Sequence, residues 1–258
     1  METVYRVMDA LLPFELFRYA FMKNALLALL LLTPLLALLG TMAVNQRMAF
    51  FSDALGHSAL AGLGLGVLLG LSNVTLILVL FGILWAVLIT RINRTGSASS
   101  DTTISVFSSA GIALGLLILS GSGQYNKYSS ILVGDVLAIA PADILWLAVA
   151  LAAGVLLWAA LYNQLLLTAV NPQLAQSRGI AVKWVEYAFV ILVAVAVMLS
   201  IRWVGVLLIN ALLILPAAAA RNVSRTAAQH ALLSVLIGLL CGVAGLVDNM
   251  PQMERTGL

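Results

Sequence analysis

Long apolar runs, almost free of charged side chains, recur along the whole chain and constrain its fold more than any other feature. An α-helix needs about 20 apolar residues to cross the roughly 30 Å hydrocarbon core of a bilayer, and each run has about that length. We delimit eight of them: residues 24–44, 48–70, 73–90, 103–120, 142–165, 184–201, 203–220 and 228–247. The pattern predicts an all-α, polytopic integral membrane protein with about eight transmembrane helices.

The composition favours lipid over water as the solvent of this chain. Hydrophobic residues make up 63% of it and charged residues only 9%, too few to cover the surface of a water-soluble globule. Its 13 basic and 10 acidic residues leave a net charge of +3, and the basic ones are scattered, so we expect no nucleic-acid partner. The single cysteine, Cys241, supplies neither a disulfide framework nor a thiolate zinc site.

The polar segments between the runs are too short for a soluble domain, so residues 1–258 are expected to form one transmembrane domain. Residues 1–23 mix acidic and basic side chains with Val, Leu and Phe, which is typical of an amphipathic helix at the membrane interface and not of a cleaved signal peptide. Residues 248–258 form a tail that is too short to span a bilayer.

Lysine and arginine residues in the short loops indicate the orientation, because loops on the cytoplasmic side retain positive charge. If loop 166–183 is cytoplasmic, alternation of the spans places seven basic loop residues on that side and two, Lys127 and Arg202, on the other. The seven are Arg47, Arg91, Arg94, Arg178, Lys183, Arg221 and Arg225. The N-terminal segment and the tail, with four basic residues between them, then face outward.

The second run carries two side chains that do not belong in lipid, Asp53 and His57. Their i, i+4 spacing places them on one face of a helix, one turn apart. A charged side chain at the bilayer centre costs about 2.5–3.5 kcal/mol on insertion scales, so this face is expected to line a bundle interior or a wet cavity. Imidazole nitrogen and carboxylate oxygen suit Zn²⁺, Mn²⁺ or Fe²⁺, and two donors alone hold an ion weakly enough for release. The pair therefore predicts ligands for a transported metal ion.

Two other interpretations of this pair stay open. The two side chains could form a hydrogen bond that only holds two helices together, or they could relay a proton. The glycines that follow, Gly62, Gly64 and Gly66, favour close packing between helices. They form no nucleotide-binding fingerprint, because no strand precedes them.

Other polar residues interrupt the apolar pattern farther along the chain. Asp135 lies between short apolar runs, and its carboxylate is compatible both with helix capping and with attracting cations to the outer mouth. Pro216 predicts a kink near residues 210–212, so that Asn210 needs a partner on another helix or lines a pore. His230 is expected at the membrane interface and not as a ligand.

Residues 171–179 read Asn-Pro-Gln-Leu-Ala-Gln-Ser-Arg-Gly. Asn171 suits a helix N-cap, Pro172 the first helical position and Gly179 the C-terminal cap. The segment predicts a two-turn helix outside the lipid, which by itself is a connector.

Three segments together resemble the permease subunit of metal-uptake ABC transporters, the family that imports zinc, manganese or iron, and most of all its high-affinity zinc branch. The first is residues 47–57 with the following Gly62, and the second is 133–143. The third comprises 171–179 and 204–221. They occur in the family's order, so that the resemblance covers residues 20–230.

The resemblance implies a role for two of these segments. Asp53 and His57 fall on the family's pathway carboxylate and histidine, in agreement with the helix argument. The segment 171–179 falls where such permeases dock their cytoplasmic ATPase. The residues implied in that coupling helix are Asn171, Pro172, Gln173, Leu174, Ala175 and Gly179.

The resemblance also implies an assembly: a homodimeric, multi-pass permease in the bacterial inner membrane, a dimer of ATP-binding cassette ATPases and an extracytoplasmic metal-binding protein. A divalent metal is cargo and no bound cofactor is expected, with zinc as the first choice and manganese or iron as alternatives. This chain differs from its relatives at Asn171, where many carry Asp or Ser. It differs again after Val247, where they continue into a helix that is expected to be missing here.

Other functional classes fit less well. The chain has no Walker-type phosphate loop, so we expect no enzyme and ATP hydrolysis by a partner. A proton-coupled secondary metal transporter could use the same Asp–His pair, although inverted repeats with paired broken helices are not evident. An intramembrane protease would need His-Glu-x-x-His or a serine among glycines within a span, and Gly121-Ser-Gly123 lies in a loop.

Overall fold

The computed structural model describes residues 20–71, 73–96, 98–125, 134, 139 and 141–248. Asp135, the tail after residue 248 and most of the predicted interfacial segment 1–23 lie outside the described residues. The described ranges contain helices and no strand. The helices are α2 (Ala20–Asn45), α3 (Phe51–Leu68), α4 (Val74–Asn93), α5 (Ser100–Gly121), α7 (Pro141–Val170), α8 (Pro172–Ser177), α9 (Val182–Val223) and α10 (Ala227–Asp248).

The all-α, polytopic fold predicted from the apolar runs is confirmed. In the described part of the chain, seven helical stretches are long and apolar enough to cross a membrane, and α9 supplies two of them. The remaining predicted span, residues 48–70, corresponds to α3. This helix is not among the seven, and it contains the polar side chains of Asp53 and His57.

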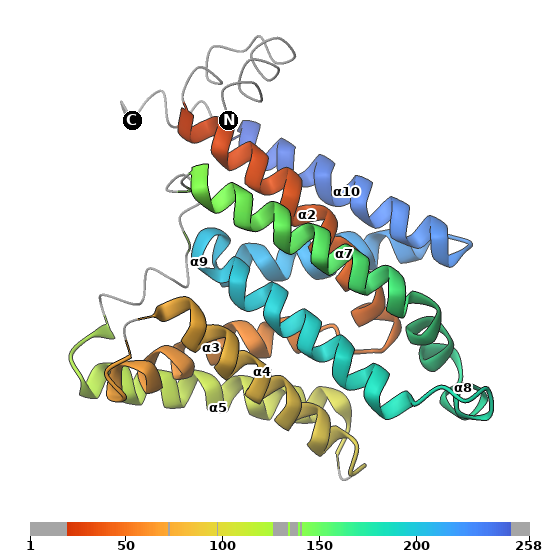
Figure 1. Ribbon diagram of the computed structural model, residues 1–258, viewed down its shortest axis with the longest axis horizontal. Coiled ribbons are helices and arrows are strands. Elements are labelled where there is room, and N and C mark those ends of the chain that lie inside the picture. Colours follow the sequence, from red (N-terminus) through yellow and green to blue (C-terminus); the bar gives the residue numbers. More distant parts are fainter. Residues whose placement is uncertain are drawn as a thin grey trace.

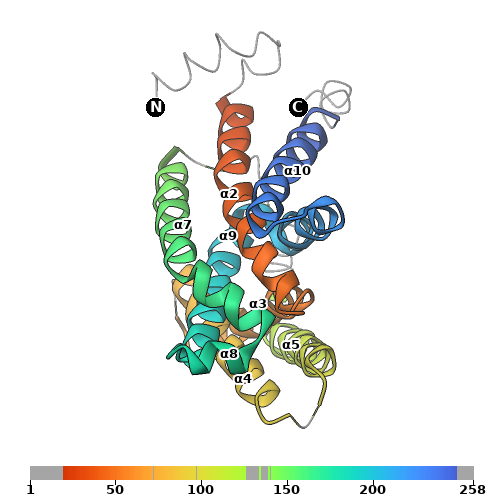
Figure 2. The same cartoon turned by 90° about the vertical axis from the view of Figure 1, so that its right-hand side faces the viewer.

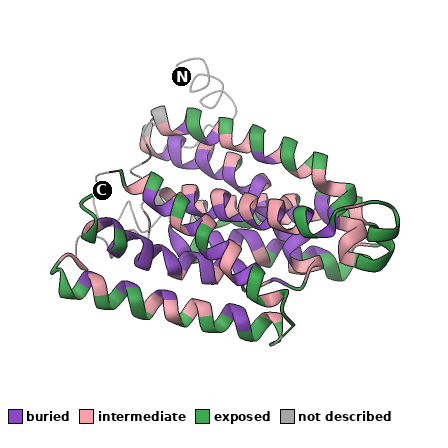
Figure 3. Ribbon diagram, turned by 60° about the horizontal axis from the view of Figure 1, so that its bottom comes forward, coloured by how far each residue is buried: buried purple, intermediate pink, exposed green. Residues whose placement is uncertain are grey.

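The helices form a bundle with α9 at its centre. This helix packs against α2, α3, α4, α7 and α10, and Figure 1 shows α3, α4 and α5 on one side of it and α2, α7 and α10 on the other. Buried residues gather in the middle of the bundle (Figure 3), whereas few residues of α5, α7 and α10 are buried. Those exposed faces are the ones available to lipid or to other chains.

The chain reverses direction inside α9 at Gly205, whose φ of 77° and ψ of 164° are far from helical values. The second half of α9 runs back beside the first (Figure 1). The kink predicted near residues 210–212 is therefore wrong in position: the helix continues through Pro216 to Val223, and its break lies at Gly205. A positive φ is accessible to glycine without the steric cost of a Cβ.

The turns after α2, α4 and the second half of α9 lie at the same end of the bundle as α8, which we call the α8 end (Figures 1 and 2). Two contacts tie these turns together. Arg94 pairs with Glu186 near the start of α9, and Nη1 of Arg221 donates to the Val44 carbonyl at 3.2 Å. All seven basic residues predicted for one side are exposed at this end.

Candidate metal site

The helix that carries the predicted metal ligands starts after a tight turn. Arg47 has a φ of 58°, and the Met48 N–H donates to the Ala43 carbonyl at 2.8 Å, which ends α2. Phe50 occupies the N-cap of α3, and its side chain makes no capping hydrogen bond. Asp53 is the acidic residue in the first turn of the helix. A carboxylate there is stabilised by the positive end of the helix dipole.

Small residues hold α3 in the bundle. Cβ atoms added at Gly111 and Gly115 of α5 would lie 2.9 Å from the Ser58 Cα and 2.5 Å from the Leu60 Cβ, respectively, so only glycine lets the two helices approach this closely. The three predicted packing glycines in the second half of α3 lie against side chains of the neighbouring helices. Gly62 faces Phe81, Gly64 faces Ile118 and Gly66 faces Ile77. Their predicted role in helix packing is confirmed.

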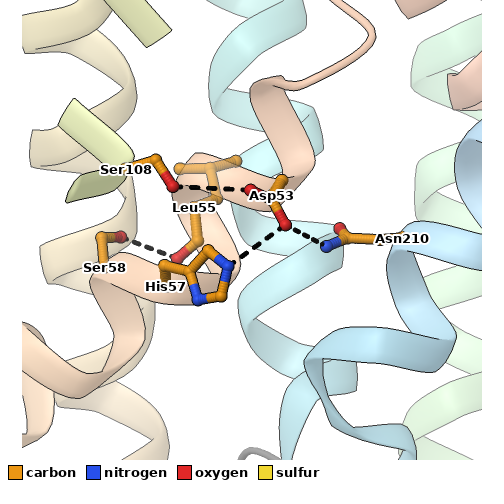
Figure 4. A network of polar contacts seen from close by, with 6 residues as sticks. All are labelled: Asp53, Leu55, His57, Ser58, Ser108 and Asn210. Atoms are coloured by element: carbon orange, nitrogen blue, oxygen red, sulfur yellow. Dashed lines mark hydrogen bonds and ion pairs between the residues drawn. The ribbon is translucent and has the colours of Figure 1, made fainter. Parts of the chain in front are cut away.

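Asp53 and His57 meet on one face of α3, as their spacing predicts. His57 Nε2 lies 3.3 Å from Asp53 Oδ1, with 29% of the His57 side chain and 39% of the Asp53 side chain exposed (Figure 4). The two groups are therefore not enclosed by tight packing. Their ligand atoms are close enough to bind one cation together.

Two further helices contribute polar groups to the same carboxylate (Figure 4). Asn210 Nδ2, from the second half of α9, donates to Asp53 Oδ1 at 2.9 Å. Ser108 Oγ, from α5, donates to Asp53 Oδ2 at 3.4 Å. The sequence indicated that Asn210 needs a partner on another helix, and this partner is Asp53. Ser108 was missed, because it is one of several serines on α5 and nothing in the sequence distinguishes it from the others.

The donor set is small. Among the described residues, no group of three or more His, Cys, Asp and Glu side chains could hold a metal ion. A cation at Asp53 and His57 would therefore need neutral oxygen ligands, water or side chains of another chain to complete its shell.

The short helix after α7 has the structure that its sequence predicts. Asn171 caps α8 by accepting hydrogen bonds from the N–H groups of Gln173 and Leu174, both at 3.0 Å. Pro172 is the first residue of α8. Gly179 lies two residues after the end of the helix and has a φ of 78°. Only Ala175 is buried in α8, so the rest of the helix is free to contact another protein.

His230 takes no part in the arrangement around Asp53. Only 4% of it is exposed, and its Nε2 lies 2.9 Å from the Ala217 carbonyl. Through this contact it joins α10 to α9.

Comparison with known proteins gives consistent matches over nearly the whole chain. The ABC 3 transport family matches residues 18–251. The manganese import system permease protein ScaB of Streptococcus parasanguinis is 32% identical over 230 residues, covering 89% of this chain and 81% of that protein. The high-affinity zinc uptake system membrane protein ZnuB of Haemophilus influenzae is 32% identical over 224 residues, covering 86% and 85%.

A solved structure supports the same assignment. PsaBC from Streptococcus pneumoniae, in complex with Fab, superposes with a TM-score of 0.77 at 28% identity, covering 97% of this chain and 87% of that chain. Sequence and fold thus agree with the resemblance found in the three segments. The chain belongs to the ABC 3 transport family.

Proposed function

We propose that this chain is the permease subunit of an ABC importer and that Asp53 and His57 receive the divalent metal ion that it moves across the bacterial inner membrane. The observation that carries the proposal is the geometry of the pair: ligand atoms 3.3 Å apart, both side chains partly exposed, on a helix packed inside the bundle. Ionisable residues in that setting mark ion pathways in membrane proteins.

Zinc is our first candidate for the ion and manganese the second, with iron as a further alternative. The names of the relatives divide between the two: zinc for ZnuB and manganese for ScaB. Imidazole nitrogen and carboxylate oxygen bind either metal, so the pair alone does not separate them.

Two copies of the chain would form the permease. Among the described residues, each copy brings only two His, Cys, Asp or Glu side chains to this site, Asp53 and His57. A second copy related by a two-fold axis would bring the same surface of its bundle to the shared path.

An ATP-binding cassette ATPase dimer would dock at the α8 end. The exposed residues of α8, Pro172, Gln173 and Leu174 among them, project from the bundle there, and Leu174 is 42% exposed. An apolar side chain on a capped helix outside the lipid is a suitable contact for a partner. An extracytoplasmic metal-binding protein would deliver the ion to the opposite end.

Uptake of ⁶⁵Zn and ⁵⁴Mn into liposomes tests the function. The permease is reconstituted with its ATPase and binding protein, and the parent is compared with Asp53→Ala and His57→Ala. Ser200→Ala is the matched control, because Ser200 is a buried hydroxyl of α9 that bonds only to its own helix, at the Ala196 carbonyl. We expect ATP-dependent uptake by the parent and the control, and its loss in both site variants.

Two results would contradict this function. Parent-level uptake by both site variants would remove the pair from the pathway. Accumulation driven by an imposed proton gradient without ATP would favour the secondary transporter, for which the Asp53–His57 contact would serve as a proton relay.

A further inference from the structure

Asn210 directs one polar atom of its amide at Asp53 and leaves the other without a partner. Its Nδ2 lies 2.9 Å from Asp53 Oδ1. Its Oδ1 is shielded from solvent and has no hydrogen-bond partner among the described residues. A buried carbonyl oxygen in this state is uncommon, because its desolvation is not offset by a hydrogen bond.

The amide has the same shape in two orientations. Without a cation, its N–H faces the carboxylate, because two oxygens at this distance would repel each other. A divalent cation beside Asp53 Oδ1 reverses this preference, since it attracts the carbonyl oxygen and repels the N–H. Rotation of the amide by about 180° then exchanges the two atoms without moving the helix.

We propose that Asn210 is a third protein ligand for the transported cation, which it binds through Oδ1 after its amide rotates. The proposal rests on the function proposed above and extends it, because it adds a residue that determines which metal the site prefers. In the metal-free protein, the same amide stabilises Asp53 by donating to it.

The distances at Asp53 suit two coordination geometries. Neighbouring ligands of an octahedral ion, at about 2.1 Å from the metal, lie about 3.0 Å apart. Ligands of tetrahedral zinc, at about 2.0–2.1 Å, lie about 3.3–3.4 Å apart. The 3.3 Å between His57 Nε2 and Asp53 Oδ1 and the 2.9 Å between Asn210 Nδ2 and Asp53 Oδ1 are both close to these spacings, so the three side chains lie within reach of one cation.

Asn210 should therefore matter more for manganese than for zinc. An amide oxygen is a hard, neutral donor of the kind that Mn²⁺ accepts readily together with carboxylate and water. Zinc needs about four ligands and binds well to imidazole and carboxylate. Removal of the amide takes away a hard oxygen donor and leaves the Asp53–His57 pair in place.

Substitution by aspartate separates a ligand from a mere supporting group. Asn210→Asp retains an oxygen in the same place but loses the N–H donor. If Asn210 only supported Asp53 by donating to it, a second carboxylate there would repel the first, and the variant would be the most damaged of all. If Asn210 is a ligand, the aspartate oxygen binds the cation and preserves uptake.

The experiment measures KM and maximal rate for ⁵⁴Mn and ⁶⁵Zn uptake separately, with the complete transporter in liposomes. The variants are Asn210→Leu, Asn210→Ala and Asn210→Asp, with Ser200→Ala as the control. We expect Leu and Ala to raise the KM for manganese about ten-fold or more, as loss of a group at a metal site does, and the KM for zinc by less than about three-fold. Asn210→Asp should stay within about three-fold of the parent for manganese.

Equal effects of Asn210→Leu and Asn210→Ala on both metals, or an Asn210→Asp variant no better than these two, would overturn the ligand role. If Asn210→Leu fails to assemble, Asn210→Ala and Asn210→Asp decide the matter, with electron paramagnetic resonance of Mn²⁺ titrated into the purified complex as the second readout. The proposal is supported if Asn210→Asp binds Mn²⁺ and Asn210→Ala does not. Any other result for these two variants opposes it.

The same uptake measurements, made on the site variants and on the Asn210 variants, distinguish failure of the proposed function from failure of the proposed role of Asn210. If Asp53→Ala and His57→Ala transport like the parent, the proposed function fails. If those variants are inactive while Asn210→Leu leaves both KM values unchanged, the function stands and only the role of Asn210 is wrong.

Discussion

Gly111 on α5 lies against the backbone of Ser58 on α3, and a Cβ at Gly111 would be 2.9 Å from the Ser58 Cα and 3.1 Å from its nitrogen. Ser58 directly follows His57, so this contact helps to set where the candidate metal site lies relative to α5. Ser108, which donates to Asp53, stands one helical turn before Gly111 on α5. The hydrogen bond from Ser108 to Asp53 therefore requires the close approach of α5 to α3 that Gly111 permits.

A methyl group at Gly111 should disturb this packing. In Gly111→Ala the new Cβ meets backbone atoms, which cannot rotate away, so the two helices must separate. We expect a loss of about 1–3 kcal/mol in stability, measured as a lower thermal denaturation temperature of the purified permease in detergent.

The matched control for Gly111→Ala is Gly121→Ala at the end of the same helix. Apart from its own helix and its chain neighbours, no atom of the described residues lies within 4 Å of the position that its Cβ would occupy. Alanine also has the higher helix propensity, so this variant should keep the parent's stability or gain slightly. Equal denaturation temperatures for the two variants would show that α3 and α5 tolerate the separation.

Gly134 makes a second backbone contact that alanine should break. It has a φ of 73°, and a Cβ there would lie 2.3 Å from the Gly205 nitrogen, at the point where α9 reverses. Gly134→Ala should therefore cost both the strain of a positive φ, about 1–2 kcal/mol, and the clash. The measurement is again thermal denaturation in detergent.

Gly123→Ala isolates the strain alone. Gly123 has a φ of 68°, and apart from its chain neighbours no atom in the described part of the chain lies within 4 Å of its Cβ position. A larger loss in Gly134→Ala than in Gly123→Ala measures the contact with Gly205. If the two variants lose the same stability, the contact contributes nothing.

Local pattern explains why much of this structure was predictable. The spans follow from apolar runs, the Asp53–His57 face follows from the i, i+4 spacing, and α8 follows from the Asn-Pro start and the final glycine. Each of these features depends on neighbouring residues in one segment, so no knowledge of tertiary contacts is needed.

Features that depend on contacts between distant segments were missed or misplaced. Pro216 was expected to bend α9, but the helix passes through it and breaks at Gly205, which meets Gly134 on another segment. Ser108 could not be singled out, because its role depends on the approach of α5 to α3. Asn210 was recognised as needing a partner, but only the folded chain identifies that partner as Asp53.

The ion pair between Arg94 and Glu186 should contribute little to stability. It joins the end of α4 to the start of α9, and its side chains are 34% and 25% exposed, respectively. Pairs this accessible to water are typically worth about 0.2–1 kcal/mol. We expect a double-mutant cycle with Arg94→Ala and Glu186→Ala, followed by thermal denaturation, to give a coupling in that range that falls at high salt.

A coupling well above that range would contradict this assignment of the Arg94–Glu186 pair as a surface interaction. It would indicate that water is excluded from the two side chains of the pair. Repeating the cycle with the ATPase bound distinguishes the isolated permease from the complex.

Removal of the Asn171 side chain should weaken the proposed coupling of α8 to the ATPase, because two N–H groups at the start of α8 lose their acceptor. Loss of such a cap costs about 0.5–2 kcal/mol, a large share for a helix of six residues. We expect Asn171→Ala to lower co-purification of the ATPase and metal-stimulated ATP hydrolysis, and Asn171→Asp to retain both. Asn73→Ala is the control, since Asn73 caps α4 through the Leu76 N–H at the opposite end of the bundle. Equal losses in Asn171→Ala and Asn73→Ala would mean that α8 has no special part in binding the ATPase.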